Sequence, residues 1–221
     1  MALRSQMPPD FNSWAEARQL RALVSEEQFA KLRSYVELLR AWNAKINLTG
    51  FSLTADLYEA LDRLILEPVS AARLLPESIQ SVVDVGSGGG SPALPLAIAA
   101  PRLSFTLVES STRKCVFLRE AIRATGLSSA KVIAERVEAV AGTPDHETFD
   151  AATVRAVRLD SELIAHLSVL VRPGGFLIHF DQAGFDQSGH EPLQGWPGFP
   201  LLATKQAEGS KWCLSIYQRT P

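Results

Sequence analysis

The most constraining feature of the sequence is an apolar run that ends in glycines, VVDVGSGGG at residues 82–90. Its β-branched residues predict a buried strand, and the glycines predict a strand-to-helix turn that a nucleotide-like ligand can approach closely. A dinucleotide fingerprint, Gly-x-Gly-x-x-Gly, would place its third glycine at position 91. Ser91 stands there instead, and the third glycine comes one residue earlier, at Gly90. The turn therefore favours an adenosine with a small polar tail over a dinucleotide.

Short apolar runs alternate with helical patterns from residue 81 onward. The predicted strands are 82–85, 104–109, 131–134, 149–154 and 176–180, and the predicted helices are 92–100, 113–125 and 161–170. This alternation predicts an α/β fold with a parallel sheet covered by helices on both faces. Residues 181–200 predict a loop, and the alternating residues 212–218 predict a last, antiparallel edge strand.

Residues 1–78 predict a helical N-terminal extension, ahead of a Rossmann-like domain at 79–221. Ser25-Glu26-Glu27-Gln28 has the pattern of a capping box, and apolar residues follow it at helical spacing. We expect this helix to run to the Asn-Leu-Thr-Gly segment at 47–50. A second helical stretch is expected at about 54–75, interrupted near Pro68 and closed by Pro76.

Composition sets broad limits on function. The formal net charge of −2 neither indicates nor excludes a nucleic-acid partner. Cys115 and Cys213 are the two cysteines, and their separation indicates neither a disulfide nor a metal site. The N-terminal residues contain no apolar signal segment and no apolar run approaches membrane-spanning length, so we expect a cytoplasmic protein without a membrane partner.

Two acidic residues are placed to serve the glycine turn. Glu109 ends the second predicted strand, 19 residues after Gly90, where an acid reaches ribose hydroxyls. The alternative for Glu109 is an ordinary solvated carboxylate at a strand end. Asp84 lies inside the first strand, where a carboxylate is costly to bury unless N–H groups or a ligand ammonium satisfy it. We expect Asp84 to organise the turn and to face the amino group of the ligand.

Other candidate cofactor residues follow the strand ends. We expect the ligand to lie over Gly86, Gly88, Gly90 and Ser91, with the first helix opening behind them. Val137 and Glu138 follow the third strand at the sheet edge, where an adenine would lie, although an ordinary surface loop is the alternative.

Arg155 follows the fourth strand, at the position that faces the reacting centre in this class of fold. A planar guanidinium there can hold a cofactor carboxylate, a base or a phosphate, and we take Arg155 as the catalytic candidate. The alternative is a salt bridge to Asp150 or Asp160.

Two absences bear on the acceptor. The chain lacks the Asn/Asp-Pro-Pro-aromatic motif of exocyclic-amine methyltransferases, and it has no cysteine after the fourth or fifth strand for attack on a pyrimidine. An acceptor that needs neither a base nor a nucleophile is favoured, such as N7 of guanine, for which alignment and desolvation supply most of the rate. Basic residues on two predicted helices are consistent with an RNA surface but are usually solvated faces; they are Arg18, Arg21, Arg33, Arg40, Lys45, Arg113, Lys114, Arg119 and Arg123.

The order of these features resembles the bacterial small-subunit ribosomal RNA guanine-N7 methyltransferases, also called glucose-inhibited division protein B. The resemblance rests on WNAKINLT at 42–49, DVGSGGGSP at 84–92, LVES at 107–110, RVE at 136–138 and FD with RA at 149–156. It implies a class I S-adenosylmethionine-dependent methyltransferase acting on a guanine N7 in 16S ribosomal RNA of the small subunit, and we expect the protein to be a monomer. It also implies that the cofactor is contacted by Gly86, Ser91, Val137, Glu138 and Arg155.

The sequence departs from that family at three places. The family usually has His-x-x-Asp-Ser where this chain has LILEP at 64–68, Phe-Pro-Gly where it has SPA at 91–93, and Lys-Gly near HF at 179–180. Two alternatives therefore stay open: a methyltransferase of the same fold with another acceptor, or a non-catalytic RNA or ribosome-assembly protein that retains the cofactor pocket. A nicotinamide oxidoreductase ranks last because the third glycine is misplaced for a pyrophosphate.

Overall fold

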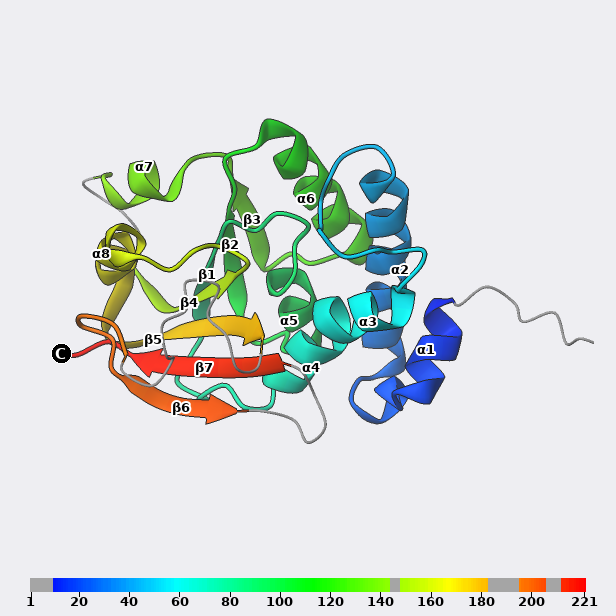
Figure 1. The fold of residues 1–221 in the computed structure, drawn as a ribbon, viewed down its shortest axis with the longest axis horizontal. Coiled ribbons are helices and arrows are strands. Elements are labelled where there is room, and N and C mark those ends of the chain that lie inside the picture. The colour runs from blue at the N-terminus through cyan, green and yellow to red at the C-terminus, as the bar shows by residue number, and fades with distance from the viewer. Residues whose placement is uncertain (1–9, 144–147, 183–194, 206–211) are drawn as a thin grey trace, which may run out of the picture.

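The computed structural model describes residues 10–143, 148–182, 195–205 and 212–221 (Figure 1). Its centre is a seven-stranded sheet in the order β3-β2-β1-β4-β5-β7-β6. The first five strands are parallel, and β7 runs antiparallel to both β5 and β6. The predicted α/β, Rossmann-like class is confirmed.

The sheet is buried between helices, and the apolar composition of its strands fits that position. Near-continuous apolar runs are typical of parallel strands covered on both faces, and every residue of β1 after Ser81 is buried. The strands are β1 (Ser81–Val85), β2 (Ser104–Val108), β3 (Ala130–Ile133), β4 (Phe149–Arg155), β5 (Val171–Gln182), β6 (Leu201–Lys205) and β7 (Trp212–Gln218).

Helices cover the sheet in two layers (Figure 1). The helical segments are α1 (Phe11–Ala17), η1 (Leu20–Ala22), α2 (Glu26–Asn43), α3 (Leu57–Leu61), η2 (Asp62–Leu66), α4 (Glu67–Ala71), α5 (Ala93–Ala99), α6 (Thr112–Thr125), α7 (Val137–Ala141) and α8 (Ser161–Leu170). One core cluster joins the sheet to α5, α6 and the N-terminal helices (α1 to α4, residues 11–71), and a second joins it to α7 and α8. Successive side chains of a strand point to opposite faces; accordingly Val82 lies in the first cluster and Val83 in the second.

The long helix α2 begins as predicted and ends earlier. Both bonds of the capping box form: Ser25 Oγ accepts from the Gln28 N–H at 3.2 Å, and Gln28 Oε1 accepts from the Ser25 N–H at 2.8 Å. The predicted end at 47–50 is wrong because the side chain of Asn43 stops the helix. Its Oδ1 accepts from the backbone N–H groups of Leu48 (2.9 Å) and Thr49 (3.1 Å), which folds the following segment back.

The second helical stretch runs from Leu57 to Ala71 without a break at Pro68. The irregularity precedes the proline: η2 is a π turn, and the N–H of Glu67 donates to the carbonyl of Asp62, five residues back. Pro68 lies in the first turn of α4, directly after the π turn. The expected interruption is therefore a π turn, a feature that occurs frequently at functional sites.

The C-terminal third differs most from prediction. β5 begins at Val171 rather than 176, with a register shift against β4 between Phe149 and Ala151. β7 is antiparallel as predicted, but β6, which was missed, is the edge strand. The predicted loop 181–200 is wrong at 181–182, which belong to β5; residues 183–194 lie outside the described residues.

Two further points concern organisation. The predicted division between residues 78 and 79 stays a prediction, although the N-terminal helices and the sheet share one core cluster. Within the part of the chain that the structure describes, no helix combines the length and apolar character needed to cross a membrane.

Candidate functional site

The glycine turn lies at the carboxyl end of β1 and has the backbone that its sequence predicts. Gly86, Gly88 and Gly90 all have positive φ angles, of 70°, 51° and 87°. A Cβ on Gly86 would lie 2.6 Å from Val157 Cγ2, and a Cβ on Gly90 would lie 2.6 Å from Leu94 Cδ1. Glycine is required at both positions for conformation and for space.

Glu109 holds this turn in place. One carboxylate oxygen, Oε2, accepts from the N–H of Gly88 at 2.9 Å, and the other, Oε1, accepts from the N–H of Ser111 at 2.8 Å. Only 7% of the residue is exposed, so the alternative of a solvated strand-end carboxylate is wrong. Glu109 thus ties the turn after β1 to the segment that opens α6.

Asp84 is buried directly beneath the turn. Its Oδ1 accepts from Thr153 Oγ1 at 2.6 Å, and its Oδ2 has no hydrogen-bond partner among the described residues. Burial raises the pKa of Asp84 to about 6, against the lowering effects of the Thr153 hydrogen bond and the positive charge of Arg155. The carboxylate therefore offers one unsatisfied oxygen to a donor or cation.

Arg155 ends β4 beside Asp84, and neither predicted salt-bridge partner holds it. Asp150 pairs with Arg172 at 2.6 Å, and Asp160 caps α8. Arg155 Nη1 instead donates to Glu67 Oε2 at 3.0 Å, and the guanidinium carbon lies 4.8 Å from the centroid of the Phe180 ring. Its Nε and Nη2 are buried and have no partner in the described part of the chain. Desolvation lowers the pKa of Arg155, against the raising effect of Glu67.

The backbone after Arg155 is strained. Ala156 has a φ of 54°, which side-chain-bearing residues rarely adopt. The next residue, Val157, packs against Gly86 closely enough that no Cβ would fit there. Such outliers are held by their surroundings and cluster at functional sites. The segment after β4 is therefore fitted directly to the glycine turn.

Glu67 and Arg63 were not predicted as site residues. Glu67 is fully buried, and its Oε2 also forms an ion pair with Arg63 Nη1, at 3.2 Å. The pair stands four residues apart around the apolar segment Leu64-Ile65-Leu66. Opposite charges flanking an otherwise apolar helical stretch are the signal that identifies them.

The N-terminal helices contact the turn at three more points. Tyr35, another residue that was not predicted, donates from its hydroxyl to the carbonyl of Gly89 at 2.6 Å. The carbonyl of Leu48 would lie 2.9 Å from a Cβ on Gly89. The predicted Ser91 donates from Oγ to the carbonyl of Leu64 at 2.8 Å. The Asn-Leu-Thr segment thus lies against the glycine turn.

Val137 and Glu138 open a short helix, α7, rather than a loop. Val137 is half-buried against the second core cluster, and Glu138 is exposed. No hydrogen bond in the described ranges joins either to the glycine turn, and their predicted contacts with adenine stay predictions. Among all the residues that the structure describes, no group of three or more His, Cys, Asp or Glu side chains is arranged to hold a metal ion.

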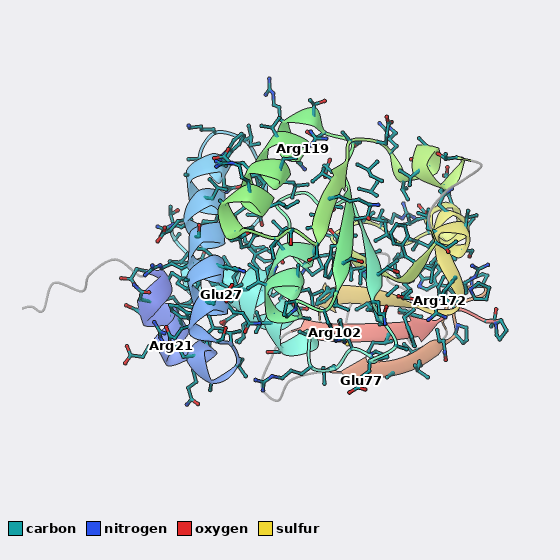
Figure 2. The ribbon with its side chains drawn as sticks, turned by 180° about the vertical axis from the view of Figure 1, so that it is seen from behind. Arg21, Glu27, Glu77, Arg102, Arg119 and Arg172 are labelled. Carbon is teal, nitrogen blue, oxygen red and sulfur yellow. The ribbon has the colours of Figure 1, made fainter. Side chains whose placement is uncertain are left out.

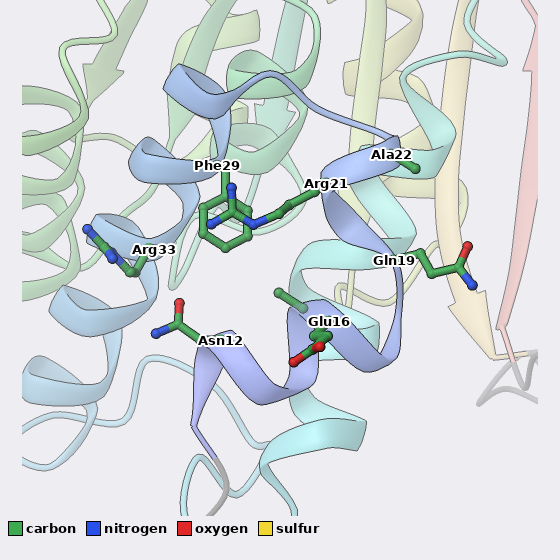
Figure 3. Close-up of a pocket in the computed structure, with 8 residues that line it drawn as sticks. Asn12, Glu16, Gln19, Arg21, Ala22, Phe29 and Arg33 are labelled. Atoms are coloured by element: carbon green, nitrogen blue, oxygen red, sulfur yellow. The ribbon is translucent and has the colours of Figure 1, made fainter.

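A hollow lies among α1, η1 and α2, apart from the glycine turn (Figure 3). Its cations already have partners: Arg21 stacks on Phe29, 3.7 Å from the ring centroid, and pairs with Glu26. Arg33 lies 3.9 Å from Glu37. We assign this hollow no role.

Comparison with known proteins connects this geometry to a family. The family model described as rRNA small subunit methyltransferase G matches residues 28–183. Relatives named ribosomal RNA small subunit methyltransferase G occur in Xanthomonas campestris pv. campestris (37% identity; 78% of this chain, 77% of the relative) and Acidiphilium cryptum (34%; 80% and 79%). In Chloroflexus aggregans the identity is 36%, over 70% of this chain and 64% of the relative.

Two solved structures share the fold at low sequence identity. A MtNAS mutant in complex with S-adenosylmethionine is similar with a TM-score of 0.56, at 14% identity over 96% of this chain and 84% of that chain. An O-methyltransferase family protein from Burkholderia thailandensis gives a TM-score of 0.54, at 17% identity over 94% and 71%.

Proposed function

Because this chain belongs to the rRNA small subunit methyltransferase G family, we propose that it transfers a methyl group to N7 of a guanine in 16S ribosomal RNA. The cofactor of this methyltransferase is S-adenosylmethionine. The observation that carries the proposal is the pairing of unsatisfied groups beside the glycine turn. Asp84 Oδ2 offers a buried acceptor, and Arg155 Nε and Nη2 offer buried donors. The methionine end of the cofactor, an ammonium and a carboxylate on one carbon, has the complementary charges.

The remaining cofactor contacts follow from the same placement. Gly86, Gly88 and Gly90 let the backbone approach the ligand. A carboxylate oxygen can accept more than one hydrogen bond, so Glu109 can hold Gly88 and still receive a ribose hydroxyl. Val137 and Glu138, after β3, are the residues we assign to the adenine. The hydroxyl of Ser91 donates to the carbonyl of Leu64, and its oxygen can still accept a hydrogen bond from the ligand.

When bound, S-adenosylmethionine supplies an electrophilic methyl group on a sulfonium. The lone pair of guanine N7 would form the new N–CH3 bond as the S–CH3 bond breaks and S-adenosylhomocysteine leaves. N7 carries no proton to lose, so the chain needs no general base. We assign the charged residues of the described site to binding instead: Asp84 and Arg155 hold the amino-acid end of the cofactor, and Glu109 holds the glycine turn. Alignment in a water-poor site then supplies most of the rate.

Basic residues that make no ion pair support an RNA substrate. The basic residues nearer the start of the N-terminal helices are neutralised: Arg18 by Asp62, Arg21 by Glu26, Lys31 by Glu27 and Arg33 by Glu37. A second group makes no ion pair among the described residues: Arg40 and Lys45 at the end of α2, and Arg113, Lys114, Arg119 and Arg123 on α6. We call these six residues the free basic face.

The two helices that carry most of the free basic face, α2 and α6, pack together. Trp42 and Phe117 join the two elements edge to face, with ring centroids 5.8 Å apart. Figure 2 shows Arg119 on α6 towards one end of this layer, and Arg21 with Glu27 towards the other. Unneutralised cations attract phosphates and release counterions, which contributes much of the affinity of proteins for nucleic acids. We propose that this face contacts the ribosomal RNA, that the protein acts as a monomer, and that it does so in the cytoplasm.

The test is methyl transfer to a mapped nucleotide. The protein is incubated with radiolabelled S-adenosylmethionine and undermethylated small ribosomal subunits, and the labelled position is mapped. Label on a guanine N7 of 16S ribosomal RNA is the expected result. Label on another acceptor overturns the choice of base, and cofactor binding without transfer overturns the enzyme in favour of a binding protein.

A further inference from the structure

A buried cluster of three charged side chains links the N-terminal helices to the end of β4. Arg63, Glu67 and Arg155 have side-chain exposures of 11%, 0% and 7%. Glu67 Oε2 accepts a hydrogen bond from Arg155 at 3.0 Å and forms an ion pair with Arg63 at 3.2 Å. A carboxylate buried this completely requires such partners, since desolvation alone would neutralise it.

A π turn in the backbone directs the Glu67 side chain towards the interior. Glu67 follows the π turn of η2 directly, and its N–H donates five residues back, to Asp62. One extra residue in a helical turn rotates everything after it by about 100°. Position 67 therefore faces inward beside Leu64 and Ile65, which are also buried.

The contact with Glu67 determines which edge of Arg155 stays available. Glu67 occupies Nη1, and the ring of Phe180 lies against the guanidinium at 4.8 Å. The opposite edge carries Nε and Nη2, the two groups that have no partner in the described residues. Two parallel N–H groups on one guanidinium edge match the two oxygens of a carboxylate.

We propose that Glu67 is a positioning residue, which holds Arg155 so that its Nε and Nη2 edge receives the carboxylate of the methionine end of the cofactor. This inference rests on the proposed function, because it needs a ligand with an amino-acid end. Arg63 supports the arrangement by sharing the same oxygen and keeping Glu67 ionised. Three charged groups leave one net positive charge, which the ligand carboxylate neutralises.

Two ligands that differ only at this end separate positioning from stability. S-adenosylhomocysteine has the amino-acid end, and 5′-methylthioadenosine lacks it. Both are titrated calorimetrically into the full chain and into Glu67→Gln, Glu67→Asp and Arg155→Met. We expect Glu67→Gln to weaken S-adenosylhomocysteine binding by about tenfold or more, the size of a lost charge-assisted pair. Affinity for 5′-methylthioadenosine should change less than about twofold, since that ligand makes no contact with Arg155.

The variants also test whether Glu67 acts through Arg155. Glu67→Asp keeps the charge and should recover part of the loss, and adding Glu67→Gln to Arg155→Met should cost nothing further. Glu59→Gln, at an exposed position of the same helical stretch, is the matched control and should leave both affinities unchanged.

Each outcome of these titrations either supports or overturns the positioning role of Glu67. Equal weakening of both ligands by Glu67→Gln, or no weakening of either, overturns the positioning role. If Glu67→Gln does not fold, Glu67→Asp gives the same comparison of ligands. Wild-type protein that binds S-adenosylhomocysteine no better than 5′-methylthioadenosine overturns the proposed cofactor site itself, a different failure from loss of the Glu67 effect alone.

Discussion

The hydroxyl of Tyr35 donates a hydrogen bond of 2.6 Å to the carbonyl of Gly89, a residue 54 positions later in the chain. Tyr35 is fully buried in α2, and Gly89 belongs to the turn on which the cofactor is expected to lie. The N-terminal helices are therefore part of the wall of the site. Ser91 with Leu64 and Arg155 with Glu67 repeat the connection at two other points.

Tyr35→Phe should separate this hydrogen bond from the packing of the ring. The change leaves the buried carbonyl of Gly89 without its donor, so we expect a loss of about 1–3 kcal/mol in the free energy of unfolding. Cofactor affinity should fall as well, because the turn is less firmly held. Denaturant unfolding and calorimetric titration measure the two effects. Tyr58→Phe, a partly exposed ring on α3, is the control, and an equal loss there would remove the special role of Tyr35.

Gly86→Ala should damage the turn through both conformation and space. A left-handed residue with a side chain costs about 1–2 kcal/mol, and the added Cβ would lie 2.6 Å from Val157 Cγ2. We expect lower stability and a cofactor affinity reduced by about tenfold or more. Gly50→Ala meets no atom within 4 Å and should change neither quantity. Retained affinity in Gly86→Ala would place the ligand elsewhere.

Asp84 should make stability depend on pH in an identifiable window. The folded pKa of about 6 lies above the ordinary value of 3.8. The native state therefore holds its proton more tightly, and stability falls as pH rises from about 4 to about 6. The full cost above that window is about 3 kcal/mol for two pKa units. Asp84→Asn keeps an acceptor for Thr153 and should remove this dependence.

The measurement is the difference in unfolding free energy between Asp84→Asn and wild type at several pH values. Groups that titrate alike in both proteins cancel in this difference, so it should grow from pH 4 to pH 7 and then level off. A ligand ammonium favours the ionised carboxylate, so wild-type cofactor affinity should rise over the same range. A flat difference would show that folding does not shift the pKa of Asp84.

Neutralising the free basic face should weaken RNA binding without touching the cofactor site. Arg119→Gln with Arg123→Gln removes two unpaired charges, and we expect the dependence of affinity on salt to fall by about one unit of slope per lost phosphate contact. Arg21→Gln with Arg33→Gln removes the same charge from paired positions and should have a smaller effect. Filter binding to 16S ribosomal RNA at several salt concentrations gives the slopes. Equal effects of the two pairs would overturn the assignment of this face.

Local signals in the sequence predicted local structure well. The capping box at Ser25 and Gln28 forms as expected, and the glycines predicted the strand-to-helix turn that Gly86, Gly88 and Gly90 form. Both kinds of feature depend on interactions within a few residues, so a single sequence contains them. The position of Glu109 beside the turn was also predictable, because parallel strands bring their carboxyl ends to one edge.

Long-range pairings were not predictable in the same way. The alternative considered for Arg155 was a salt bridge to Asp150 or Asp160, its neighbours in sequence, yet its partner is Glu67, 88 residues away. That contact depends on a π turn, which no propensity scale identifies. The edge strand β6 was missed because Leu201–Lys205 is short and its register depends on β7, which follows it in the chain.

The carbonyl of Leu48 is a second reason for the run of glycines at positions 88–90, besides the backbone angles. Positions 88 and 90 need glycine for backbone angle, but position 89 needs it for clearance, because a neighbouring loop occupies the volume of a side chain. A protein with the same sheet but no such loop would be free to carry alanine or serine at position 89. The unbroken run Gly88-Gly89-Gly90 therefore reflects the packing of the N-terminal segment against the turn.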